Sequence, residues 1–190
     1  MQALPYAHRL ELERREPEAR RASLAGLGLV LAGAVRVTQR EFPPQAFTFP
    51  PAGKPRLTGG PHFSISHSSS YVTCMVCADT DCGIDIEARL DAADSAMVAK
   101  LRRWTATEAA LKAAGLGLRA AGEVALADSL RAAIVHDQQY ELQALDDLPG
   151  VTGHFAAKKK LTPSIAPLEL DDAWMSALLE RSFGLATQIE

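Results

Sequence analysis

A short stretch of strand-forming residues carries the feature that most limits the fold of this chain. Residues 71–78 are rich in β-forming side chains, residues 79–81 have the composition of a turn, and residues 83–87 predict a second strand. We therefore expect a β-hairpin here. Side chains two residues apart on a strand share a face, so Asp85 and Glu87 should direct two carboxylates to one place.

The remaining sequence predicts both helices and strands. Apolar spacings of three and four residues predict an amphipathic helix from about residue 10 to 35 and a longer one from 94 to 114, ended by Gly115. Prolines and glycines between residues 43 and 61 predict a surface loop. Strands are expected at residues 130–135, 140–145 and 151–158, and a short helix at residues 168–182.

Composition and charge limit the classes of function. The 190 residues are 47% hydrophobic and 23% charged, as in ordinary globular proteins. A net charge of −3 provides no overall attraction to nucleic acid or to an anionic membrane. The first residues mix arginine with glutamate, and the longest uncharged apolar run, residues 22–35, is shorter than the about 20 residues of a membrane span. We expect a cytoplasmic protein that binds neither nucleic acid nor membrane.

Three carboxylates and one lysine are the side chains best suited to chemistry. Glu108 and Lys112 are four residues apart in the predicted helix and therefore share a face. Together with Asp85 and Glu87, Glu108 could complete an all-oxygen site for a hard cation such as Mg²⁺, with Lys112 beside it for a phosphate group. The ordinary alternatives are a solvent-facing acidic strand and a surface Glu–Lys pair.

A serine-rich segment precedes these acids. SISHSSS, residues 64–70, predicts a turn whose hydroxyls, backbone N–H groups and imidazole could hold a phosphate, with Ser66 and His67 at its centre. The ordinary interpretation of His67 is a turn histidine without a ligand.

Taken in order, these motifs resemble those of the 4′-phosphopantetheinyl transferases. FSISHS at residues 63–68, GIDIE at 83–87 and W-x-x-x-E-A-x-x-K at 104–112 carry the resemblance. GKP at residues 53–55 and the arginine pair at 20–21 are weaker matches. The resemblance covers about residues 20 to 118, and three ordered motifs are more specific than any one of them.

The resemblance implies an α+β fold of the larger, surfactin-type group. That fold is a pseudo-dimer of two similar α/β halves, here residues 1–90 and 91–190, with the active site in the cleft between them, and the protein would be a monomer. It implies an enzyme, a holo-[acyl-carrier-protein] synthase type transferase. The substrates would be coenzyme A and an apo acyl or peptidyl carrier protein, whose serine receives the 4′-phosphopantetheine group as adenosine 3′,5′-bisphosphate leaves.

The resemblance also implies roles for individual residues. Asp85, Glu87 and Glu108 would hold Mg²⁺, and Asp85, Glu108 and Lys112 would be the catalytic residues. Glu108 would accept the proton of the carrier serine, and Lys112 would bind a pyrophosphate oxygen. The implied coenzyme A contacts are Arg20, Arg21, Lys54, Pro55, Ser66, His67 and Lys112.

Two departures from the family pattern keep other functions open. The family has a lysine directly before the glutamate of its tryptophan motif, where this chain has Thr107, and the segment between Glu87 and Trp104 has only 16 residues. One alternative is a degenerate member that binds coenzyme A without transferring from it. Another is a Mg²⁺-dependent hydrolase of a small phosphate ester.

Overall fold

The chain begins with two helices where the sequence predicted one. In the computed structural model, which describes residues 4–51, 53–89, 94–146 and 148–166, α1 (Tyr6–Glu13) and α2 (Pro17–Thr38) are separate. Pro17 occupies the first turn of α2, where its missing N–H leaves no hydrogen bond unmade, so the proline starts a new helix. The helix expected at residues 168–182 lies outside the described residues.

The proline-rich segment is mostly irregular, as predicted. It contains one 3₁₀ turn, η1 (Pro44–Ala46), and two strands of two residues each, β1 (Phe47–Thr48) and β2 (Arg56–Leu57), which pair antiparallel. Phe47 and Leu57 are buried against α2, so the segment still contributes to the core.

The predicted hairpin between residues 71–78 and 83–87 is wrong. β4 (Tyr71–Cys77) pairs antiparallel with β3 (His62–Ser68), and the turn lies at Ser69 and Ser70, so most of the expected serine turn is strand. β5 (Cys82–Ala88) pairs instead with β9 (Val151–Ala157). The short link after β4 connects two different sheets, because the strand that pairs with β5 is β9, which lies more than 60 residues later in the sequence.

Strand β5 and the strands of the second half of the chain form a five-stranded antiparallel sheet in the order β5-β9-β8-β7-β6. Its strands confirm the three predicted after residue 130. The elements that complete this half are α3 (Ser95–Ala114), η2 (Leu118–Glu123), β6 (Val124–Leu126), β7 (Ala132–Val135) and β8 (Gln138–Leu145).

Helix α3 is the predicted long helix, and local sequence sets both of its ends. The side chain of Asp94 accepts a hydrogen bond of 2.8 Å from the backbone N–H of Met97, which caps the first turn. Gly115 ends the helix in the left-handed conformation, with φ of 73°. Small residues on one face of α3, including Ala106, Ala109 and Ala113, pack against the sheet.

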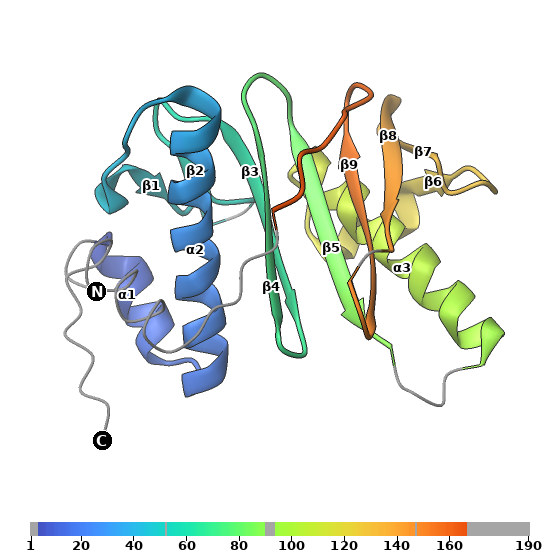
Figure 1. Cartoon of the computed structure of the whole chain (residues 1–190), viewed down its shortest axis with the longest axis horizontal. Coiled ribbons are helices and arrows are strands. Elements are labelled where there is room, and N and C mark those ends of the chain that lie inside the picture. The colour runs from blue at the N-terminus through green and yellow to red at the C-terminus, as the bar shows by residue number, and fades with distance from the viewer. Residues whose placement is uncertain (1–3, 52, 90–93, 147, 167–190) are drawn as a thin grey trace.

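The fold is α+β and is arranged in layers (Figure 1). α2 packs on one face of β3 and β4, and α3 covers one face of the five-stranded sheet. A third cluster joins the opposite face of that sheet to β4, through Ile84, Ile86 and Phe155 with Tyr71 and Met75. β3 and β5 therefore lie where the two halves of the chain meet.

Helix α2 meets the length and apolarity of a membrane-crossing helix, and 44% of its most apolar window is buried within the protein. Its inward residues belong to the core cluster with Phe47 and Phe63. A core helix passes the same test of composition, so the predicted cytoplasmic location stays a prediction.

Candidate metal centre

Three carboxylates converge where β5 meets α3. Asp85 and Glu87 point from alternate positions of β5, and Glu108 points from α3. One oxygen from each side chain lies within 4.8 Å of the other two, and this is a group that could hold a metal ion. The structure thus brings together the three acids that the sequence separated by some twenty residues.

A glycine allows α3 to come this close to β5. A Cβ atom built on Gly83 would lie 2.0 Å from the carbonyl oxygen of Ala109 and 2.5 Å from the backbone nitrogen of Ala113. No larger residue fits there without moving the helix. Because Glu108 precedes Ala109, the same close contact brings Glu108 next to Asp85.

Asp85 is the most buried of the three acids, with a side chain only 3% exposed. Its Oδ1 accepts hydrogen bonds from Lys112 Nζ at 2.6 Å and from Ser66 Oγ at 2.9 Å. Its Oδ2 is buried and has no hydrogen-bond partner within the described part of the chain. A buried carboxylate oxygen normally has a partner, so this atom is a candidate ligand for a cation or a water molecule.

The electrostatics of the cluster favour a bound cation. Burial raises the pKa of Asp85, although the Lys112 ammonium and the hydrogen bonds to Asp85 oppose that rise. Burial also raises the pKa of Glu108, and the neighbouring Asp85 carboxylate adds to the effect. Both shifts reflect the cost of placing negative charges close together away from water, a cost that a divalent cation would remove.

The residues present fit an oxygen-ligated divalent cation. On octahedral Mg²⁺, opposite ligand oxygens are about 4.2 Å apart and adjacent ones about 2.9 Å, so three carboxylates within 4.8 Å of one another would need to close by up to about 1.9 Å. With all three acids ionised, the acids and Lys112 sum to a charge of −2, which one divalent ion neutralises. Asp85 Oδ2 is the carboxylate oxygen that has no hydrogen-bond partner among the described residues.

A ladder of serine hydroxyls holds β5 in place. Ser64, Ser66 and Ser68 alternate along β3, so all three face β5. Their Oγ atoms accept hydrogen bonds from the backbone N–H groups of Ile84, Ile86 and Ala88, at 3.1, 3.3 and 2.9 Å. β5 is an edge strand of its sheet. The serine hydroxyls accept hydrogen bonds from its backbone N–H groups in place of a neighbouring strand.

The same ladder orients the carboxylates. Ser66 Oγ donates to Asp85 Oδ1, and Ser68 Oγ donates to Glu87 Oε2 at 3.1 Å. Each of these hydroxyls therefore binds both the backbone and an acidic side chain of β5. We infer that the serine ladder, defined as Ser64, Ser66 and Ser68, positions the two carboxylates of β5.

Removing one hydroxyl of the ladder should weaken metal binding without unfolding the protein. Ser68→Ala deletes the donor to Glu87, and loss of a group that orients a metal ligand typically costs 10–100-fold in affinity. We expect roughly a tenfold loss in Mg²⁺ affinity, measured by titration calorimetry. Ser68→Thr, which keeps the hydroxyl, should restore the affinity, and Ser70→Ala in the exposed turn is the matched control. Equal affinities for Ser68→Ala and Ser70→Ala would contradict the positioning role.

The other predicted site residues lie outside the acid cluster. Ser66 is 6% exposed and is committed to the ladder. His67 is exposed and, by alternation, faces the α2 side of β3, and α2 carries Arg20 and Arg21 near its first turn. Lys54, next to Pro55, donates a 2.7 Å hydrogen bond to the carbonyl of Cys82, about 10 Å along β5 from Asp85.

Sequence reasoning missed two parts of the site. The alternation of Ser64, Ser66 and Ser68 is a strand pattern of period two, and this was the signal that the segment is not a turn. The second part is Gly83, whose role depends on the distance between a helix and a strand. Thr107, the departure from the family pattern, turns its hydroxyl back to the carbonyl of Arg103 at 2.9 Å.

Comparison with known proteins adds no identification: no protein-family model matches the chain, and no curated protein is significantly similar to it.

Proposed function

We propose that this protein transfers the 4′-phosphopantetheine group of coenzyme A to a serine of an apo acyl or peptidyl carrier protein. The observation that carries the proposal is the cluster of Asp85, Glu87 and Glu108 with Lys112 at its edge and one buried carboxylate oxygen unpartnered. Such a cluster suits phosphoryl transfer, in which a cation and a lysine stabilise charge on phosphate oxygens. The resemblance of the three ordered motifs to the 4′-phosphopantetheinyl transferases supplies the substrates.

In this proposal each residue has a separate task. Asp85, Glu87 and Glu108 hold Mg²⁺, which when bound stabilises negative charge on the pyrophosphate. Glu108 takes the proton of the carrier serine while the serine oxygen bonds to the β-phosphorus. The bond from that phosphorus to the departing adenosine 3′,5′-bisphosphate then breaks. Burial raises the pKa of Glu108 in the metal-free protein, and a bound cation would oppose that rise.

Lys112 links the cluster to the substrate. Its side chain is 28% exposed, and Asp85 and Ser66 accept hydrogen bonds from two of its three ammonium N–H groups. We place a pyrophosphate oxygen against the third. His67, with Arg20 and Arg21 of α2, is proposed for the nucleotide phosphate, and Lys54 and Pro55 for the rest of the coenzyme.

The proposed architecture is a pseudo-dimer with the active site between its halves. Each half has a long helix packed on antiparallel strands: α2 packs on β3 and β4, and α3 packs on the five-stranded sheet, whose edge strand β5 comes from the first half (Figure 1). Side chains of β3, β5 and α3 contribute to the acid cluster and its supports. A monomer therefore contains every residue that the proposal needs.

The proposal is tested by incubating the purified protein with coenzyme A, Mg²⁺ and several apo carrier proteins. Intact-mass spectrometry should show one carrier gaining a single phosphopantetheine group, and no gain should occur when EDTA replaces Mg²⁺. Absence of any gain, together with measurable coenzyme A binding, would support the non-catalytic alternative. Phosphate release from a small ester without coenzyme A binding would support the hydrolase.

A further inference from the structure

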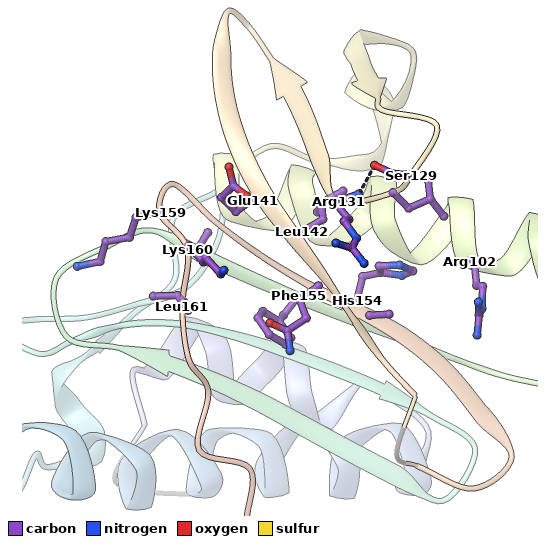
Figure 2. A pocket seen from close by; sticks show the side chains of 14 residues that line it. Arg102, Ser129, Arg131, Glu141, Leu142, His154, Phe155, Lys159, Lys160 and Leu161 are labelled. Carbon is purple, nitrogen blue, oxygen red and sulfur yellow. Dashed lines mark hydrogen bonds between the residues drawn. The ribbon is translucent and has the colours of Figure 1, made fainter.

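A cavity lies on the part of the chain that follows β5, and none of its lining residues belongs to the acid cluster. It has a volume of about 540 Å³ and lies against β8 and β9, between the loop before β7 and the segment that leaves β9 (Figure 2). Cavities that bind small molecules usually measure about 300–1,000 Å³. This one is therefore large enough for a ligand with about ten heavy atoms or more.

The cavity concentrates positive charge in a chain whose net charge is −3. Its cationic lining residues outnumber its one acid, Glu141. The cations are Arg102, Arg131, Lys159 and Lys160.

Two of these cations already have carboxylate partners, and two do not. Arg102 pairs with Asp146 at 3.0 Å, and Lys159 pairs with Asp79 at 2.6 Å. Within the described residues, the charged groups of Arg131 and Lys160 have no carboxylate partner within 4.0 Å. In Figure 2 the Arg131 guanidinium is directed toward His154, and Lys160 lies on the other side of the cavity. Two unpaired cations lining one hollow are an anion-binding arrangement.

Apolar and neutral groups form the rest of the wall. Leu130, Leu142, Phe155 and Leu161 contribute apolar side chains to the wall of the cavity. His154 is 2% exposed, and its Nδ1 is hydrogen-bonded to the hydroxyl of Thr105 at 2.8 Å, so its ring is fixed. A ligand that satisfied the whole wall would have an anionic head and an apolar body.

We propose that this cavity binds a small organic anion, a carboxylate or a phosphate monoester attached to an apolar group. Arg131 and Lys160 attract the anionic head from opposite sides of the cavity, and the apolar lining residues contact the apolar body. The site does not depend on the proposed transfer activity, because none of its residues belongs to the acid cluster.

Four probes test the proposal on the full-length protein by titration calorimetry. Benzoate and phenyl phosphate carry both features, benzyl alcohol lacks the charge, and inorganic phosphate lacks the apolar body. We expect benzoate or phenyl phosphate to bind at least tenfold more tightly than benzyl alcohol and inorganic phosphate. Arg131→Met and Lys160→Met should each weaken that binding about tenfold or more. Arg119→Met, an exposed arginine outside the cavity, is the matched control and should leave the binding unchanged.

Three results would overturn the inference. They are no binding of benzoate or phenyl phosphate at millimolar concentration, equal binding of benzyl alcohol, and affinity that survives the Arg131→Met, Lys160→Met double variant. Both substituted residues are exposed, and circular dichroism will verify that the variants remain folded. If these variants bind the anion more weakly but still transfer phosphopantetheine to the carrier at an unchanged rate, the cavity and the proposed active site are separate.

Discussion

Replacing Asp85 by asparagine should reduce the Mg²⁺-dependent transfer of phosphopantetheine by roughly 10²–10³-fold or more, the usual effect of removing a central electrostatic group from a site. Asparagine has nearly the same volume and can still accept the hydrogen bond from Ser66. The substitution removes the charge and one of the two carboxylate oxygens. It therefore removes the buried Oδ2 as a cation ligand while it leaves the packing in place.

Two measurements separate this effect from unfolding. Titration calorimetry should show that Mg²⁺ affinity falls together with the rate, and thermal unfolding should show that the protein remains folded, because a neutral side chain avoids the cost of burying a charge. Asp128→Asn, at an exposed acid in the loop before β7, is the matched control and should leave both unchanged. A near-normal transfer rate for Asp85→Asn would mean that the metal centre is wrongly assigned.

The elements that the sequence predicted well are those whose signals are local. The ends of α3 follow from Asp94 and Gly115, because a capping carboxylate and a left-handed glycine act within one helical turn. The strands after residue 130 follow from runs of β-forming residues around a turn. Each of these features depends on neighbours within about five residues.

The pairing of the strands could not be predicted in the same way. The link between β4 and β5 has the composition of a hairpin turn, yet the two strands belong to different sheets. The alternating serines of β3 satisfy the free edge of β5, and β9 pairs with its other edge. The strand that pairs with β5 is selected among strands far apart in the sequence, and no local sequence pattern indicates which one it is.

The candidate site was predictable in its chemistry but not in its geometry. A period-two pair on a strand and an i,i+4 pair on a helix identified Asp85, Glu87, Glu108 and Lys112 as partners. These spacings could not predict the distance between β5 and α3. It depends on the backbone contact at Gly83, which the sequence marks only as a glycine at the start of a strand.

Gly83→Ala should therefore affect both stability and the site. The new methyl group would lie 2.0 Å from the carbonyl oxygen of Ala109, so α3 would have to move by more than 1 Å to reach ordinary contact. Overpacking of this kind typically costs about 1–3 kcal/mol, and the rigid backbone contact favours the upper end, so we expect the free energy of unfolding in urea to fall by about 3 kcal/mol.

The same movement carries Glu108 and Lys112 away from Asp85, and a misplacement of about 1 Å can cost 10²-fold in rate. Mg²⁺ affinity of the folded Gly83→Ala protein should fall with the transfer rate. Gly117→Ala is the matched control, because a Cβ atom there meets nothing within 4 Å and its φ of −89° suits any residue. The control should change the free energy of unfolding by no more than about 0.5 kcal/mol. If the two alanine variants are equally stable, α3 does not pack against β5 as closely as described, and the short distance between Glu108 and Asp85 loses its basis.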